Sequence, residues 1–319
     1  MKSLGQFREA LPKGFTEWLY RDFPPSEAER ILRGMATERP TTLRVNTLRA
    51  TPQAVEEEFQ REGIRLKRIS WLSEAFEVDG AREGRIERTR TYTEGAVYLQ
   101  SLSSMLPPLC LLPQPGEQVL DMAAAPGSKT TQMAAMMRNE GRILAVEPDP
   151  RRAATLQANL TRQGAAMVEV VAGRGEQVAS RHPASFDRVL LDAPCSGEGR
   201  FTPSPQTYRH WNEREVQKLA KLQKRMLEAA LGAVKPGGLV LYSTCTLNRQ
   251  ENEEVVLDAV GRGGAELVAL PMDVPESLPG RAGRDGPREL ARTRRVLPVG
   301  RMEGFYLALL RRLDAAPAS

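Results

Sequence analysis

Cysteine and histidine are scarce in this chain of 319 residues, which contains three cysteines and two histidines. Three cysteines far apart in the sequence cannot form a disulfide framework. Two histidines argue against a zinc site, so we expect no bound metal. No apolar run is long enough to span a membrane, and the first residues lack the apolar stretch of a signal peptide. We therefore expect a cytoplasmic protein with no membrane partner.

Internal repeats and low-complexity tracts are absent as well. The chain is 27% charged and 41% hydrophobic, which is typical of a globular protein, and its length allows two domains. The net charge of +5 is unevenly distributed, because residues 281–312 contain nine arginines and only three acidic residues. A cluster of six of these arginines suits phosphate binding, although a solvated loop explains the same charges equally well. Its members are Arg281, Arg284, Arg288, Arg292, Arg294 and Arg295.

The pattern over residues 1–95 predicts an N-terminal module with helices and a small α+β unit. Two prolines at 24 and 25 separate a helix from Phe7 to about Tyr20 from a second helix toward Arg33 that begins after a Ser26 cap. Further expected elements are strands at 42–48, 64–69 and 75–78, and a helix at 52–62 capped by Thr51. RRM-like modules of this kind commonly bind RNA, and they are as often purely structural.

From Tyr98 onward, strands and helices alternate, which is typical of an open, mostly parallel sheet. We therefore expect a Rossmann-like α/β domain over residues 96–315. The expected strands are 118–121, 142–147, 167–171, 186–192 and 239–243, with 266–270 and 304–310 as further members. The expected helices are 130–138, 150–163 and 213–234. Residues 235–238 are expected to form a turn, and residues 271–290 a long surface loop.

The segment after the first of these strands has the composition of a ligand-binding turn. It contains Ala123, Ala124, Ala125, Pro126, Gly127, Ser128 and Lys129. Small side chains let the backbone approach a ligand, and the following helix N-terminus offers N–H groups to an anion such as a carboxylate. Glu147 ends the next strand, where a carboxylate can accept hydrogen bonds from two ribose hydroxyls. The pattern predicts a nucleoside cofactor without naming it, because NAD would fit the same geometry; a plain tight turn is the alternative.

Two cysteines follow strands that should end at the same sheet edge as this loop. Cys195 lies in the segment Asp-Ala-Pro-Cys-Ser-Gly and Cys245 in Tyr-Ser-Thr-Cys-Thr, whereas Cys110 lies in an apolar run and is expected in the core. A thiolate that adds to carbon 6 of a cytosine makes carbon 5 nucleophilic enough to accept a methyl group. Asp192 is the natural partner for N3 and the exocyclic amine of such a base, and a second thiol can assist product release.

With these motifs the sequence resembles the Fmu/NSUN (Sun-type) family of RNA cytosine-5 methyltransferases over most of its length. Two separate cysteine motifs at these positions are far more specific than a single glycine-rich loop. The other matching segments are residues 44–48, Gln100 with residues 103–105, residues 123–129, Glu147 with Arg152, residues 223–224, 251–253 and 303–305. The resemblance implies a Rossmann-like methyltransferase fold with a mostly parallel, seven-stranded sheet.

The resemblance also implies the cofactor, S-adenosyl-L-methionine. By it, residues 123–129 hold the carboxylate side of the cofactor, Glu147 binds the ribose, and Arg152 belongs to the same site. The family usually has an aspartate after the third strand, near the adenine amino group. Ala172 and Gly173 occupy that position in this chain, so the recognition of adenine departs from the family pattern.

The catalytic roles follow from the resemblance in the same way. The nucleophile of the family is the cysteine of Ser-Thr-Cys, here Cys245, and Cys195 promotes release of the product. Asp192 lines the site beside cofactor and base, and Lys129 orients this polar cluster. DNA cytosine-5 methyltransferases use a Pro-Cys nucleophile instead, so the local motif alone would select Cys195.

Within the family the best resemblance is to bacterial small-subunit rRNA methyltransferases of the RsmF kind. It implies RNA as partner, either 16S rRNA or a ribosomal subunit, and tRNA is the alternative substrate. A ribosome-assembly factor with impaired catalysis is a third reading, because Ala172 and the loop at 200–205 depart from the family pattern. RsmF enzymes generally have an extra C-terminal RNA-binding part, which we expect this shorter chain to lack. We expect a monomer.

Overall fold

The computed structural model describes residues 4–80, 83–281 and 287–314. Its first helices are α1 (Leu4–Ala10), α2 (Phe15–Asp22) and α3 (Pro25–Met35). The prediction of one continuous helix from Phe7 to Tyr20 is wrong, because Gly14 adopts a left-handed conformation with φ of 86° between α1 and α2. The predicted Ser26 cap is also wrong, since α3 begins at Pro25 after Pro24.

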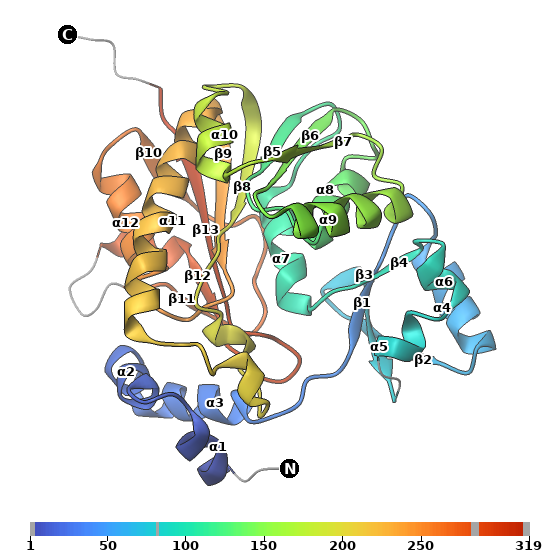
Figure 1. Cartoon of the computed structure of the whole chain (residues 1–319), viewed down its shortest axis with the longest axis horizontal. Coiled ribbons are helices and arrows are strands. Elements are labelled where there is room, and N and C mark those ends of the chain that lie inside the picture. Colours follow the sequence, from blue (N-terminus) through green and yellow to red (C-terminus); the bar gives the residue numbers. More distant parts are fainter. Residues whose placement is uncertain (1–3, 81–82, 282–286, 315–319) are drawn as a thin grey trace.

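A four-stranded antiparallel sheet follows these helices, in the order β2-β3-β1-β4 (Figure 1). Its elements are β1 (Thr42–Val45), α4 (Pro52–Arg61), β2 (Arg65–Ile69), β3 (Leu72–Asp79), α5 (Glu83–Ile86), α6 (Arg90–Thr93) and β4 (Val97–Leu99). The predicted Thr51 cap is confirmed, because its hydroxyl accepts a hydrogen bond from Ala54 N at 3.2 Å. Strand β1 is shorter than predicted because the Asn46 side chain accepts a hydrogen bond from Leu48 N and turns the chain.

The second sheet has nine strands, of which β5 to β9 run parallel in the order β7-β6-β5-β8-β9. These strands are β5 (Gln118–Asp121), β6 (Arg142–Glu147), β7 (Val168–Ala172), β8 (Phe186–Asp192) and β9 (Val234–Thr244). Antiparallel strands extend the sheet beyond β9: β10 (Ala265–Val268), β11 (Ser277–Pro279), β12 (Arg294–Val296) and β13 (Phe305–Arg312). The predicted Rossmann-like α/β architecture is confirmed, but the predicted number of seven strands is wrong, because the described residues place nine strands in this sheet.

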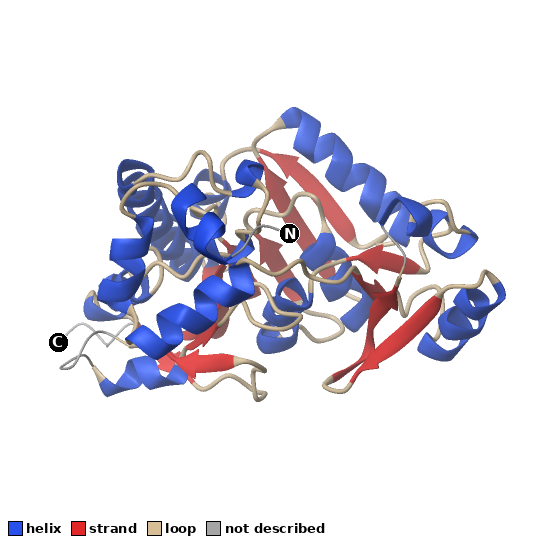
Figure 2. Cartoon of the chain, turned by 90° about the horizontal axis from the view of Figure 1, so that it is seen from below, coloured by secondary structure: helices blue, strands red, loops and turns tan. Residues whose placement is uncertain are grey.

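Helices cover both faces of this sheet (Figures 1 and 2). One face carries α7 (Leu102–Leu111), α8 (Ser128–Met136) and α9 (Pro150–Gln163), and the other carries α10 (Gly175–Ser180), α11 (Glu213–Ala233) and α12 (Glu253–Gly261). Successive strand residues alternate between the two cores: Val119 packs on the first face and Leu120 on the second. Within the described ranges, no helix is long and apolar enough to cross a membrane.

Two local predictions in this region need correction. Residues 235–238 are not a separate turn but belong to β9, where they form an irregularity in the pairing with β8 between Phe186 and Arg188. Residues 271–290 are not one loop, because β11 lies within them and the short 3₁₀ helix η3 (Arg288–Arg292) begins there. The other short 3₁₀ helices are η1 (Glu198–Arg200) and η2 (Pro205–Thr207).

The arginine cluster predicted to bind phosphate is not one surface. Arg295 is buried, and its guanidinium binds both carboxylate oxygens of Glu253, with one contact at 2.8 Å. Arg292 donates to the carbonyl of Leu267 at 2.6 Å, and Arg284 lies outside the described residues. As a set the prediction is therefore wrong, since breaking a buried ion pair to reach a phosphate costs several kcal/mol, about 3–5.

Hydrophobic clusters tie the helices α1–α3 to the larger sheet's loops, and not to the four-stranded sheet. Phe15 packs against Phe201 and Trp211 with ring centroids 5.1 and 5.2 Å apart. The four-stranded sheet has its own cluster with α4. Whether a domain boundary lies near residue 95 stays a prediction.

Two polar residues of the Arg44–Leu48 motif connect the two sheets. The Arg44 guanidinium is buried and donates to Gln100 Oε1 at 2.9 Å and to Thr131 Oγ1 of α8 at 3.0 Å. Burial lowers the pKa of Arg44 to about 10. The Asn46 amide donates to the carbonyl of Gln163 at the end of α9 at 2.7 Å. This motif therefore fixes β1 against the helices that flank the first strands of the larger sheet.

Candidate active site

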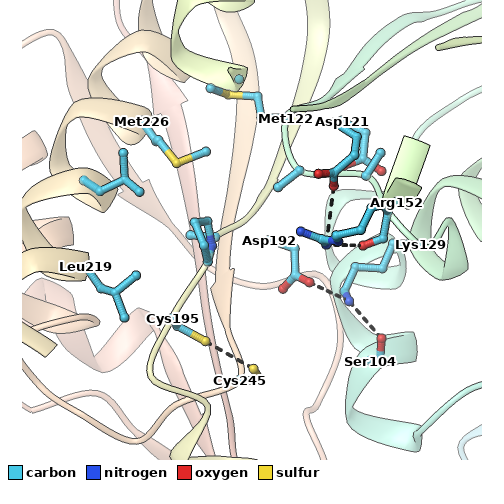
Figure 3. Close-up of a pocket in the computed structure, with 18 of the residues that line it drawn as sticks. Ser104, Asp121, Met122, Lys129, Arg152, Asp192, Cys195, Leu219, Met226 and Cys245 are labelled. Atoms are coloured by element: carbon cyan, nitrogen blue, oxygen red, sulfur yellow. Dashed lines mark hydrogen bonds and ion pairs between the residues drawn. The ribbon is translucent and has the colours of Figure 1, made fainter. Parts of the chain in front are cut away.

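The carboxyl ends of β5, β6, β8 and β9 meet at one edge of the sheet. Strand β5 lies between β6 and β8, so the strand order reverses there, and open α/β sheets bind ligands at such a point. A cavity of about 1410 Å³ opens at this edge (Figure 3). Of the site residues predicted from the sequence, all except Gly127 line it.

Gly127 has a conformational role instead. It precedes α8 with φ of 103°, and a Cβ added there would lie 2.9 Å from Leu156 Cδ1. As the N-cap residue, Gly127 has no side chain to accept a hydrogen bond from the first N–H groups of α8, so these groups can bind an anion. A cofactor carboxylate would fit this position.

Glu147 is buried at the end of β6 and is held in place from two sides. Its Oε1 accepts a hydrogen bond from Asp149 N at 3.0 Å, and its Oε2 lies 3.4 Å from Arg152 Nη2. The same Arg152 nitrogen donates to the carbonyl of Ala125 at 2.9 Å and thereby connects the two halves of the predicted cofactor site. A fixed carboxylate at this strand end fits a ribose diol, so the donor and acceptor groups present match S-adenosylmethionine.

The segment after β7, where the family usually has an aspartate, has a different arrangement in this chain. Ala172 and Gly173 do not line the cavity, whereas Arg174, Gly175 and Glu176 do. A Cβ added to Gly175 would lie 2.4 Å from the carbonyl of Met122, so the backbone passes close to the β5 loop. Glu176 is the carboxylate that the structure places on this side of the cavity.

Asp192 and Lys129 form an ion pair inside the cavity. Lys129 Nζ lies 2.7 Å from Asp192 Oδ2 and donates to Ser104 Oγ at 2.8 Å (Figure 3). Ser243 Oγ donates to the other carboxylate oxygen of Asp192, also at 2.8 Å. The lysine side chain is 11% exposed and the aspartate side chain 26%, so the carboxylate remains reachable from the cavity.

The two predicted cysteines lie in direct contact. Cys195 Sγ and Cys245 Sγ are 3.1 Å apart, and neither belongs to a disulfide (Figure 3). The hydrogen bond from the Cys195 thiol lowers the pKa of Cys245, against the opposing effect of burial, and the nearby Arg200 lowers it further. The same hydrogen bond, together with burial, raises the pKa of Cys195. Cys245 is therefore the thiol that ionises first.

Cys110 behaves as predicted. It is buried in the core between α7 and the sheet, and burial raises its pKa to about 12.

Three buried carboxyl groups near the site were not predicted from the sequence. Asp121 ends β5 and accepts a hydrogen bond from Thr130 Oγ1 at 2.7 Å, yet burial raises its pKa to about 6. Burial and the neighbouring Glu251 raise the pKa of Glu198 to about 7, and burial also raises the pKa of Glu251. Because Glu198 and Glu251 lie far apart in the sequence, only their positions in the fold identify them as a pair.

This carboxyl pair holds the two cysteine loops together. Glu251 Oε2 accepts from Ser196 N at 3.0 Å, next to Cys195. Ser196 Oγ lies 2.8 Å from Thr246 Oγ1, next to Cys245. Glu198 Oε1 accepts hydrogen bonds from Trp211 Nε1 at 2.8 Å and from Asn248 Nδ2 at 3.1 Å. The serine and threonine that follow the cysteines in the two motifs thus fix the distance between the thiols.

A backbone crossing completes the site. Gly199 N donates to the carbonyl of Cys245 at 3.0 Å, and Gly304 N donates to the carbonyl of Gly199 at 2.9 Å. A Cβ added to Gly199 would lie 1.9 Å from the carbonyl oxygen of Gly304, so no larger residue fits without moving a strand end. The crossing explains why residues 303–305 are part of the motif set.

Comparisons with known proteins agree with this geometry. A family model described as 16S rRNA methyltransferase RsmB/F matches residues 108–311, and a model of an RsmF/B-like ferredoxin-like domain matches residues 11–83. The ribosomal RNA small subunit methyltransferase F of Shewanella loihica is 38% identical over 286 residues, which is 86% of this chain and 57% of that protein. The chain thus spans little more than half of that relative.

Two further relatives match nearly end to end. The tRNA (cytosine(49)-C(5))-methyltransferase of Pyrococcus abyssi is 40% identical over 275 residues, covering 85% of this chain and 88% of that protein. The crystal structure of a methyltransferase homolog protein from Pyrococcus horikoshii superposes with a TM-score of 0.85 at 34% identity, covering 97% of this chain and 98% of that one. The family resemblance predicted from the motifs is confirmed: this chain belongs to the RsmB/F family of 16S rRNA methyltransferases.

Proposed function

We propose that this chain methylates carbon 5 of a cytosine in RNA, with small-subunit ribosomal RNA as the substrate. The observation that carries the proposal is the pair of thiols, 3.1 Å apart, at the sheet edge that also carries the cofactor loop. A protein that only binds RNA needs no ionisable thiol in contact with a second thiol, which argues against the assembly-factor alternative.

S-adenosylmethionine is the cofactor of this family, and when bound it supplies an electrophilic methyl group. The free N–H groups of α8 would hold its carboxylate and Glu147 its ribose. Arg152 contacts both Glu147 and the carbonyl of Ala125 and so holds these two parts of the site together.

Cys245 acts as the nucleophile. Its thiolate would add to carbon 6 of the cytosine, so that the electrons of the 5,6 double bond form a 4,5 double bond and those of the 3,4 double bond move onto N3. The resulting enamine would make carbon 5 nucleophilic enough to take the electrophilic methyl group that a bound cofactor supplies. Arg200 and the Cys195 thiol both favour the Cys245 thiolate. They therefore increase the fraction of enzyme that is ready to react.

Asp192 positions the base. Its carboxylate lies in the cavity between Lys129 and Ser243 and can accept a hydrogen bond from the exocyclic amine of the cytosine. The positive charge of Lys129 beside it can stabilise the negative charge that develops on N3. Lys129 orients this carboxylate, and Ser104 in turn fixes Lys129.

Cys195 serves the last step. Once carbon 5 carries the methyl group, its proton would pass to water in the open cavity, and the electron pair of that C–H bond would re-form the 5,6 double bond. The bond between Cys245 Sγ and carbon 6 would then break, with its electron pair returning to the sulfur as a thiolate. Cys195 lies within 3.1 Å of the departing sulfur, so its thiol can donate a hydrogen bond that stabilises the Cys245 thiolate as it leaves.

Transfer RNA is the second candidate substrate, and one observation favours it. The chain covers 88% of a tRNA methyltransferase but only 57% of the first RsmF relative. Labelled S-adenosylmethionine offered with 16S rRNA transcript, small ribosomal subunits or unmodified tRNA distinguishes the two. Methyl transfer to tRNA alone would overturn the rRNA assignment, and transfer to no RNA would favour the assembly-factor alternative.

The thiol roles predict opposite behaviour for two variants. Cys245→Ala should abolish both methylation and covalent RNA adduct, because nothing activates carbon 5. Cys195→Ala should still attack and methylate, then accumulate a protein–RNA adduct that remains visible on a denaturing gel. Cys110→Ala is the control, with turnover at the wild-type level. An adduct in Cys245→Ala and none in Cys195→Ala would reverse the assignment.

A further inference from the structure

A row of four basic residues runs along one face of α11. Arg214, Lys218, Lys221 and Arg225 follow one another at intervals of four, three and four residues, which places them on the same side of a helix. All four are exposed, and all four line the cavity that holds the cysteines. With a rise of 1.5 Å per residue, the row is about 16 Å long.

These four basic residues form fewer ion pairs than the basic residues next to them. Lys224 and Arg262, on and beside the same helix but outside the cavity, are paired with Asp258. In the row, Lys218 has one exposed partner, Glu215 at 3.2 Å. Across the described ranges, no carboxylate lies within 4.0 Å of the charged groups of the other three. Their charge is available to a ligand in the cavity.

The opposite wall of the cavity has the reverse character. It presents Asp121, Glu147 and Asp192 at the strand ends, and two of the bases beside them, Lys129 and Arg152, are already paired with two of these carboxylates. Arg174 and Arg200 also line the cavity. Between the walls lie the apolar side chains of α11, among them Leu219 and Met226 (Figure 3). A polyanion that enters the cavity is therefore attracted to α11 and repelled from the strand ends.

We propose that this row, Arg214 to Arg225, binds the phosphates of RNA nucleotides next to the target cytosine. The inference rests on the proposed function, and it replaces the C-terminal arginine cluster as the main phosphate contact. With its phosphates bound to α11, the RNA can direct the target cytosine past the apolar side chains Leu219 and Met226 toward Cys245. The row can contact several successive phosphates, because its length exceeds the spacing of neighbouring nucleotides.

The test compares two triple variants of equal charge change. The first is Arg214→Gln, Lys218→Gln and Lys221→Gln. The matched control is Arg142→Gln, Lys235→Gln and Arg311→Gln, whose side chains are 43–47% exposed at the opposite edge of the sheet. Binding of oligocytidylate RNA is measured from about 50 to 200 mM salt, where each lost contact on a single strand lowers the log–log slope by about 0.7.

The row variant should lower this slope by about 2, and the control should leave it unchanged. Arg214→Lys, Lys218→Arg and Lys221→Arg should restore the wild-type slope, which separates charge from loss of fold. An unchanged slope in the row variant, or an equal fall in the control, overturns the inference. Methylation of 16S rRNA and tRNA by the wild type is measured in parallel: its absence refutes the proposed function, whereas activity with an unchanged slope refutes only the role of the row.

Discussion

Replacing the buried Glu198 by glutamine should remove a defined part of the pH dependence of stability. Burial and Glu251 raise the pKa of this group from its ordinary value of 4.5 to about 7 in the folded chain. Between these values the folded state holds a proton that the unfolded state has released. The stabilisation is therefore full below pH 4.5 and is lost as the pH rises through 7.

The magnitude follows from this difference. One pKa unit corresponds to about 1.4 kcal/mol, so ionising Glu198 lowers the free energy of unfolding by about 2.5 kcal/mol between pH 5 and pH 8. Glutamine keeps an oxygen to accept from Trp211 but does not titrate. Glu198→Gln should therefore lose about 2.5 kcal/mol less than the wild type over this interval.

The assay is urea unfolding at both pH values, with the free energy taken from the midpoint and slope. Glu289→Gln, an exposed acid on η3, is the control and should follow the wild type. Asp121 contributes in the same direction and remains in all three proteins, so its contribution cancels in the comparison. The same pH dependence in Glu198→Gln and wild type would refute a buried, protonated Glu198.

Three further substitutions test the remaining geometry. Gly199→Ala places a Cβ 1.9 Å from the carbonyl oxygen of Gly304. The variant should lose about 1 kcal/mol or more of folding stability, which lowers its melting temperature, and it should methylate RNA more slowly. A melting curve like that of the wild type would contradict the close approach of Gly199 and Gly304. Glu176→Ala should weaken S-adenosylmethionine binding about fivefold, as measured by calorimetry, because it removes a hydrogen-bond acceptor worth about 1 kcal/mol. Ala172→Asp, at a position outside the cavity, should change the binding affinity less. A larger change in Ala172→Asp than in Glu176→Ala would place the adenine contact at position 172.

The sequence predicts the strand ends of this site because parallel strands deliver their last residues to one edge. Asp192 and Cys245 follow apolar strands with clear ends, so the strand pattern alone predicts that they meet. Their partners could not be predicted in this way. Ser243 and Lys129 reach Asp192 from separate elements, and no periodicity records a contact between residues so far apart in the chain.

The predicted phosphate-binding arginine cluster was wrong for a related reason, because a count of charges in the sequence does not show which of them are paired in the fold. Arg295 adds to a basic cluster in the sequence, but its charge is cancelled by the buried Glu253, which lies on α12. The row on α11 has an equally visible spacing, yet only the fold decides that this helix face borders the cavity and not solvent alone. Helix α11 also carries acidic residues, so its net charge gives little signal.

The packing of the first three helices has a consequence for synthesis of the chain. Phe15 packs against Phe201 and Trp211, and Phe7 packs against Tyr208, all of which leave the ribosome more than 160 residues after α3. At 5–20 residues per second this interval is roughly 10–30 s. During this interval Phe7 and Phe15 lack these partners, so the first helices are a segment of the growing chain on which a chaperone would act.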